Sequence, residues 1–327
     1  EYRAAHGRFA TRFGKQVFSW GRVEEAKPRD AVFPRDMQNL LSPEEIRIGV
    51  WSWWGQYDPN PMFSVQSMVI PTFTPHRLPR GTNRWSLSPF DQPIDTPRND
   101  MEHAQGGVSV TTHLPRVDVT GSYFRGPSLF PSLLPVFASF PSFTYPIEHV
   151  WGMDVGFPQL PIGTNGEITV KGEGTYTRSE GNVGDDLFRY ALYVDYTVED
   201  VLRPRDQARL ALQYLGATVA HEGVGIEYPR FFSDAWMGAL EYFPRGQAGG
   251  TTVRCIGVYN ASQRGRQPML KSGDALLRVE ASTTLWSRVT LTIGAQQLSG
   301  PRGSIFGDYE ESSGIDCGLT IRFGGKR

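Results

Sequence analysis

Alternation of apolar and polar residues is the dominant pattern along this chain, and it is clearest in the C-terminal half. Between residues 188 and 198 every second residue is apolar, whereas the intervening positions include Arg189, Asp195 and Thr197. A period of two places the two sets on opposite faces of a β-strand. The pattern therefore predicts an extended strand with one apolar face and one polar face.

The same period recurs along the whole chain and predicts about fifteen strands. The segment 207–217 is the least distinctive of them, because Ala, Leu, Gln and Arg also favour a helix. The predicted strands lie near 1–8, 10–19, 45–55, 62–72, 104–114, 116–124, 143–157, 166–177, 187–198, 207–217, 232–243, 250–261, 270–281, 286–297 and 314–323.

The connections between these strands alternate in length. Short ones lie near Gly7, 56–61, 114–116, 158–165, 199–206, 244–249 and 282–285. Longer ones occupy roughly 20–44, 73–103, 125–142, 178–186, 218–231, 262–269 and 298–313. This alternation is typical of an outer-membrane β-barrel, with short turns in the periplasm and long loops outside.

Strand parity adds an expectation about the beginning of the barrel. The first and last predicted strands run in the same direction, whereas bacterial barrels have an even number of strands. We therefore expect an all-β, antiparallel, up-and-down transmembrane barrel of about 16 strands, in which the first strand either lies upstream of residue 1 or is misassigned by the pattern. No linker or internal repeat divides the sequence, so residues 1–327 are expected to form a single domain.

Three features favour a membrane barrel over a soluble β-sandwich. Strands of about ten residues match the tilted span of a bilayer. Residues 315–323 alternate and close on Phe323, similar to the C-terminal signal of bacterial barrels, although Gly324–Arg327 follow. Aromatic residues lie toward strand ends, where barrels place their interfacial girdles: Trp20, Trp51, Tyr123, Phe143, Phe157, Tyr176, Tyr196, Phe232, Tyr242, Trp286 and Phe323.

Composition excludes several other classes. Hydrophobic residues make up 39 % of the chain, which is too many for a disordered protein. The formal net charge of −1 gives no basic field for nucleic acid. Apolar runs are too short for a transmembrane helix. Cys255 and Cys317 fall on strands three apart, too distant for a disulfide, and are expected to be free thiols facing lipid or neighbours.

A family resemblance points the same way. Residues 9–36 contain Ser-Trp-Gly followed by two Pro-Arg-Asp triplets, at 28–30 and 34–36. Three further stretches that resemble the same family lie at 69–79, 83–85 and 122–126. These motifs resemble a proteobacterial outer-membrane porin-like β-barrel family of poorly defined function, although both triplets lack the preceding Asn of that family. The resemblance covers the first 130 residues. It implies a barrel in the outer membrane of a Gram-negative bacterium, without a settled substrate.

If the apolar faces contact lipid, the polar faces line the lumen. The interpretation as a wet pore that orients charged solutes and the interpretation as an ion-pair network filling the barrel are equally open. The predicted pore-lining residues are Arg116, Asp118, Asp154, Lys171, Glu173, Arg189, Asp195, Arg209, Arg254, Arg278, Glu280, Arg288, Asp316 and Arg322.

The run 129–143 is apolar and contains three prolines, at 131, 135 and 141. An exposed segment of this kind indicates a surface for a substrate or partner, and the alternative is a loop folded onto the barrel rim. Its candidate contact residues are Leu129, Phe130, Leu133, Leu134, Phe137, Phe140 and Phe143.

Two further loops are charged. Residues 20–44 could constrict the entrance or hold a cation through Glu24, Glu25 and Asp30, but a solvated, self-paired loop is the favoured interpretation. Residues 306–311 contain Asp308, Glu310 and Glu311 without the spacing of a calcium loop.

Catalytic signatures are lacking, so we expect no enzyme, no cofactor and no resident metal. The leading hypothesis is a porin-like channel for passive diffusion of small solutes, embedded in outer-membrane lipid. Two alternatives stay open. One is a plugged structural barrel that docks an envelope protein complex, and the other is a transporter of hydrophobic molecules with a lateral gap beside 129–143. Each of these three hypotheses is compatible with a homo-oligomer or with envelope protein partners. None of them involves binding to nucleic acid.

Overall fold

The computed structural model describes most of the chain. The described ranges are 2–3, 7–24, 26–38, 47–83, 86, 94, 96–100, 103–134, 142–157, 159–227, 234–246, 250–261, 273–285, 288–304 and 306–321. No helix within these ranges is long and apolar enough to cross a bilayer.

The fold is an antiparallel up-and-down sheet. In the described ranges this sheet has 16 strands, and successive long strands pair with their neighbours in chain order. The strands on this path are β1 (Tyr2–Arg3), β2 (Phe9–Gln16), β3 (Val50–Asn60), β4 (Phe63–Ile70), β5 (Gln105–Leu114), β6 (Val117–Pro127), β9 (Ile147–Gly156), β11 (Gly166–Ser179), β12 (Asp186–Glu199), β13 (Gln207–His221), β15 (Asp234–Phe243), β16 (Thr251–Asn260), β17 (Asp274–Leu285), β18 (Val289–Ser299) and β19 (Gly314–Ile321).

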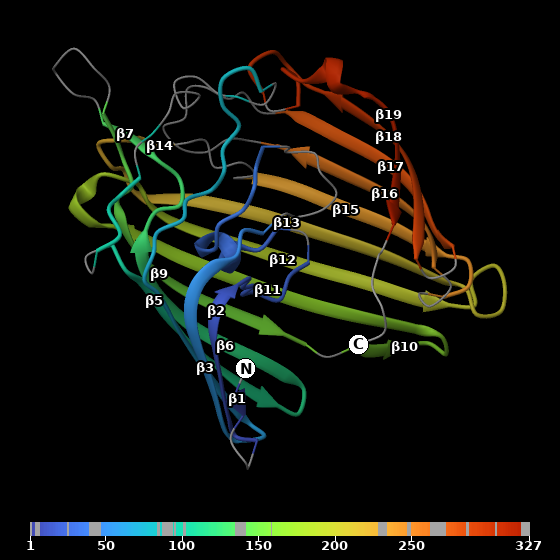
Figure 1. Cartoon of the computed structure of the whole chain (residues 1–327). Helices are drawn as coiled ribbons and strands as arrows, with labels where there is room; N and C mark the ends of the chain where they lie inside the picture. The colour runs from blue at the N-terminus through green and yellow to red at the C-terminus, as the bar shows by residue number, and fades with distance from the viewer. Residues whose placement is uncertain are drawn as a thin grey trace.

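The sheet curves into the wall of a β-barrel, with β1 and β19 at the two ends of the strand order (Figure 1). Within the described ranges no ladder joins β1 to β19. The short strand β10 (Leu160–Ile162) pairs with β11 at the end of the short connections. The opposite end carries a small sheet of β7 (Ser132–Leu134), β8 (Ser142–Thr144) and β14 (Ile226–Glu227).

The exposed face of the wall is the apolar one. Along β12 and β13, Leu192 is 59 % exposed and Leu210 is 56 % exposed. On the inner face Gln213 is 1 % exposed and Asp195 is 7 % exposed. A soluble sandwich buries its apolar face and solvates its polar face, so this arrangement is the reverse. It is the arrangement of a membrane barrel, whose strands alternate apolar-out and polar-in.

The predicted strands correspond closely to the observed ones. Each predicted segment overlaps one strand of the main path, and 207–217 falls within strand β13 rather than a helix. Boundaries differ from the predicted ones at several turns. Residues 56–60 belong to β3, because a shift in register between Tyr57 and Asn60 accommodates Pro59, which lacks an N–H for the ladder. Residues 282–285 likewise continue β17, which ends at Leu285.

Within the described ranges the long connections contain three short 3₁₀ turns. They are η1 (Pro28–Val32), η2 (Glu180–Asn182) and η4 (Glu310–Ser312). The turn η1 lies between β2 and β3, on the inner side of the wall near β11 (Figure 1). This position brings the charged N-terminal connection into the lumen, where the candidate site is found.

Candidate functional site

Residues 17–24 and 26–37 form a segment, here called the inserted segment, that lies against the inner face of the wall. Its Trp20, Val32 and Phe33 are buried in one apolar cluster with inner-face residues of four strands. The wall residues of this cluster are Val50 of β3, Met68 and Ile70 of β4, Phe124 of β6 and Val150 of β9. Trp20 was predicted at a bilayer interface, which is wrong, because the ring lies inside the barrel at 7 % exposure.

Next to this cluster the inner face of the wall carries two carboxylates that face each other. Asp154 of β9 lies directly across the ladder from Glu173 of β11. They are 1 % and 5 % exposed. Like charges directly opposite each other destabilise a sheet, and buried charges require partners. The pair therefore depends on positive or N–H groups brought from elsewhere in the chain.

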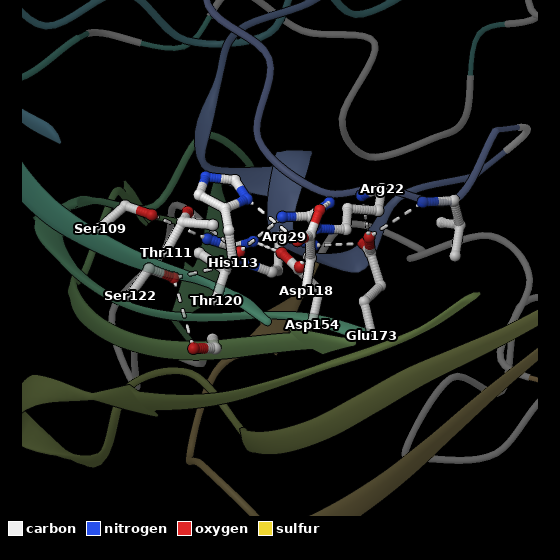
Figure 2. A network of polar contacts seen from close by, with 12 residues as sticks. Arg22, Arg29, Ser109, Thr111, His113, Asp118, Thr120, Ser122, Asp154 and Glu173 are labelled. Carbon is white, nitrogen blue, oxygen red and sulfur yellow. Dashed lines mark hydrogen bonds and ion pairs between the residues drawn. The ribbon is translucent and has the colours of Figure 1, made fainter. Parts of the chain in front are cut away.

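The inserted segment supplies these groups through two arginines (Figure 2). Arg22 Nε lies 2.6 Å from Asp154 Oδ1, and Arg22 Nη1 lies 2.8 Å from Oδ2 of Asp118 on β6. Arg29 forms an ion pair with the other oxygen of Asp154. One wall carboxylate is thus held between two guanidinium groups from the same segment.

Glu173 is satisfied by the backbone of the segment instead. Its Oε1 accepts the N–H of Arg29 at 2.9 Å and its Oε2 accepts the N–H of Arg22 at 3.0 Å. Gly21 makes this approach possible. Its φ is +95°, and a Cβ there would lie 2.5 Å from Glu173 Oε2. A side chain at position 21 would be strained at this φ and would displace the Glu173 carboxylate from its backbone contacts.

Hydroxyl groups complete the contacts of the arginines. Arg29 Nε donates to Ser122 Oγ at 3.2 Å, and Arg29 Nη2 donates to Ser109 Oγ at 3.3 Å. Arg22 Nη2 lies 3.4 Å from Thr120 Oγ1. Burial lowers the pKa of Arg29 to about 10, so this guanidinium stays charged at neutral pH.

A carboxylate of the inserted segment itself, Asp30, connects parts of the segment to one another. Asp30, which is fully buried, accepts the Trp20 N–H at 2.8 Å and pairs with Arg35 at 2.8 Å and Arg47 at 2.9 Å. Burial raises the pKa of Asp30 above its usual value, against the opposing effect of both arginines. The prediction of a self-paired loop is confirmed for Asp30 and Arg35. The prediction of a solvated loop is wrong for Arg29 and Asp30, because both are buried.

The strands on the other side of the lumen carry a row of alternating charge. Arg209 lies across from Glu241, Glu241 from Arg254, and Arg254 from Glu280. Glu241 pairs with Arg209 at 3.1 Å and with Arg254 at 2.9 Å. Cross-strand pairs of opposite sign stabilise neighbouring strands. The row supports the interpretation that many inner-face charges brace the wall.

Other predicted lumen residues also find partners on the inner face. Lys171 Nζ lies 2.6 Å from Oε1 of Glu24 in the inserted segment. Asp195 lies 3.5 Å from Arg209. Arg278 binds Glu280 at 2.9 Å and Asp316 at 2.8 Å. Arg189 lies on the inner face of β12, beside Ala191 and in register with Thr175 and Ala217.

Two predicted pore-lining residues lie in turns instead of on the inner wall, and a third lies outside the described residues. Arg116 lies in the exposed turn after Pro115, because proline ends the ladder there, and not on the inner wall. Arg288 is also an exposed turn residue, with its N–H bonded to the Leu285 carbonyl at 3.1 Å. Arg322 lies outside the described residues.

The apolar run 129–143 is largely packed in its described part. Leu129 is buried with Phe73, Leu78 and Tyr145, and Phe130, Leu133 and Phe143 pack against the same cluster. Leu134 is half-buried in β7, and Phe137 and Phe140 lie outside the described residues. The hairpin β7–β8 thus supports the interpretation of a loop folded onto the rim.

Metal binding gains no support from the two acidic loops. No group of three His, Cys, Asp or Glu side chains suited to a metal ion occurs in the part of the chain that the structure describes. Glu24 and Asp30 are engaged by Lys171 and by Arg35 and Arg47. Cys255 and Cys317 are free thiols.

Comparison with known proteins agrees with this architecture. No protein-family model matches the chain, and no curated protein matches it. The crystal structure of OccD3 (OpdP) of Pseudomonas aeruginosa, an outer-membrane porin, is similar in fold, with a TM-score of 0.52 and 9 % sequence identity. The alignment covers 96 % of this chain and 73 % of that chain. The chain therefore shares the β-barrel fold of that protein.

Proposed function

We propose that this protein is an outer-membrane channel through which small polar solutes diffuse passively. The observation that carries the proposal is the arrangement of the wall, which has apolar side chains on its outer face and charged or polar side chains on its inner face. A lumen lined in this way stabilises water and hydrated solutes, whereas an exterior of Leu, Val, Ile and aromatic side chains suits lipid. The fold shared with OccD3 supports the same function.

The inserted segment would set the width of this channel. It lies inside the wall, is anchored to Asp118, Asp154 and Glu173, and contributes Glu24 opposite Lys171. These contacts fix the segment against β6, β9 and β11. Because charges of both signs line the lumen in pairs, we expect weak selectivity between anions and cations.

The proposal is tested by solute influx into proteoliposomes. Uncharged sugars of increasing size should enter at rates that fall steeply with size, because a narrow polar pore sieves its solutes. Liposomes containing a Lys15→Gln variant, altered on the outer face of β2, serve as the matched control and should behave like the wild type. Influx of the smallest sugar no faster than in protein-free liposomes would contradict the proposal.

A plugged structural barrel is the second candidate, and one observation favours it. Val23 of the inserted segment and Phe306 of the connection before β19 belong to a buried apolar cluster with inner-face residues such as Tyr193, Met237 and Leu298. Apolar filling of this kind narrows the water-filled cross-section. Protein that inserts stably but passes no sugar would support this candidate.

A lateral route for hydrophobic molecules finds less support beside residues 129–143. The strands next to this run, β6 and β9, are continuously paired from Asp118 opposite Gly156 to Pro127 opposite Ile147. A lateral opening would require this ladder to separate.

A further inference from the structure

Three basic residues form a row across the outer face at the end of the long connections. Arg125 of β6 lies across from His149 of β9, and His149 lies across from Arg178 of β11. All three are on the face that carries Met153 and Leu192, which are among the exposed apolar residues. We call Arg125, His149 and Arg178 the basic row.

A row of aromatic residues lies directly beside it, two residues further into the wall. Tyr123, Trp151 and Tyr176 are in register across the same three strands. Their ring centroids are 5.6 Å apart for Tyr123–Trp151 and 5.8 Å apart for Trp151–Tyr176. Aromatic side chains on the outer face of a barrel lie at the level of lipid headgroups. The basic row therefore lies at that level or just above it.

Hydrogen bonds hold part of the row in place. Tyr123 OH lies 2.7 Å from His149 Nδ1, and His149 Nε2 lies 2.7 Å from Glu180 Oε1. The same Glu180 oxygen accepts a hydrogen bond from Arg125 Nη2 at 3.2 Å. Glu180 thus orients Arg125 and His149 side by side, while both remain partly exposed.

Arg178 differs from its two neighbours. It is exposed and makes no ion pair with any residue that the structure describes. A nearby acid, Asp186 of β12, accepts the Ser179 N–H at 2.9 Å and the Tyr176 hydroxyl at 3.4 Å. Arg178 consequently offers a free guanidinium next to two groups that are already oriented.

We propose that the basic row binds the phosphorylated headgroup of a lipid in the leaflet next to the long connections. The proposal rests on the membrane location assumed for the channel. Guanidinium groups bind phosphate oxygens with two parallel hydrogen bonds, and opposite residues of neighbouring strands are about 5 Å apart. One phosphate can therefore contact Arg178 and a neighbour while the acyl chains of the lipid lie over Trp151, Met153 and the apolar wall.

The test measures heat stability in lipid nanodiscs with and without diphosphoryl lipid A in a phosphatidylcholine background. The unfolding midpoint of the wild type should rise with the phosphorylated lipid and should not respond to free inorganic phosphate. Arg178→Gln should weaken this response about tenfold in lipid concentration, the loss expected for one charge-assisted contact. Arg125→Gln/Arg178→Gln should abolish it, and Lys15→Gln, which removes another outer-face cation at the same end, should retain it.

Two results would overturn the inference: an undiminished response in Arg178→Gln, or an equal rise with inorganic phosphate. Because Arg178 has no partner among the described residues, its single variant should unfold at the wild-type temperature in phosphatidylcholine alone, which separates binding from folding. Sugar influx should be unchanged in this variant. Wild-type protein that shows the lipid response but no influx would support the headgroup site and contradict the channel.

Discussion

Arg22 and Arg29 both bind Asp154, but they differ in how deeply they are buried. The side chain of Arg29 is 3 % exposed, whereas that of Arg22 is 28 % exposed. Screening by water weakens the contribution of an exposed charge, and a buried charge that loses its partner is strongly destabilising. The two arginines therefore hold the same carboxylate with unequal consequences.

This difference predicts the effect of removing each guanidinium. Arg29→Gln should lower the free energy of unfolding by about 3–5 kcal/mol, because it leaves Asp154 and Glu173 facing each other without the buried cation. Arg22→Gln should cost about 1 kcal/mol or less, since Arg22 is partly solvated. Urea unfolding in detergent, followed by tryptophan fluorescence, measures both. Equal losses for the two variants would contradict this account of the site.

Asp30 gives the inserted segment a pH dependence. Burial raises the pKa of its carboxyl above the unfolded value, so the stability linked to this group is present at low pH and is lost as pH rises through the raised pKa. The free energy of unfolding of the wild type should therefore fall relative to that of Asp30→Asn as pH increases above the ordinary aspartate range, about 4. Denaturant unfolding of both proteins at a series of pH values measures the difference. If the wild type instead gained stability relative to Asp30→Asn as pH increased, the effect of burial on the Asp30 pKa would be contradicted.

At the level of the elements, local periodicity was sufficient to predict the strands and their faces. In β12 the alternation of Leu192 and Val194 with Tyr193 and Asp195 assigned each side chain to the face on which it lies. The inserted segment could not be predicted in this way. The contact of Arg22 with Glu173 joins residues 151 positions apart, and no local pattern specifies such a contact. Its density of charge was visible, but charge runs more often remain solvated.

The orientation of the wall predicts how single strands tolerate charge. Leu192→Arg, on the outer face of β12, should destabilise the protein in lipid vesicles by about 2–4 kcal/mol, because the guanidinium would lie in hydrocarbon. Thr292→Arg, on the inner face of β18, is the matched control and should cost much less, since that face contacts water. Unfolding in vesicles measures both variants. If Leu192→Arg were as stable as Thr292→Arg, the apolar face would be solvated and the protein would not span the bilayer.

For the whole molecule, the sequence predicted the strand path and the alternation of short and long connections. The two ends of the wall were correctly distinguished, because turns such as that at Pro115 are short and the connections that contain η1 and β7–β8 are long. The small sheet of β7, β8 and β14 was not predicted, because strands of two or three residues show no period. Whether the lumen conducts depends on how the inserted segment and the connection before β19 fill it, which is a long-range property of packing.

The most direct test of the account is single-channel conductance in planar bilayers. We expect steady openings whose conductance increases in proportion to salt concentration, as in a water-filled pore. The double variant Arg22→Gln/Arg29→Gln should conduct more than the wild type, because the inserted segment loses its ion pairs with Asp118 and Asp154. Wild-type protein that is inserted and folded but shows no openings would contradict the channel and would identify the barrel as plugged.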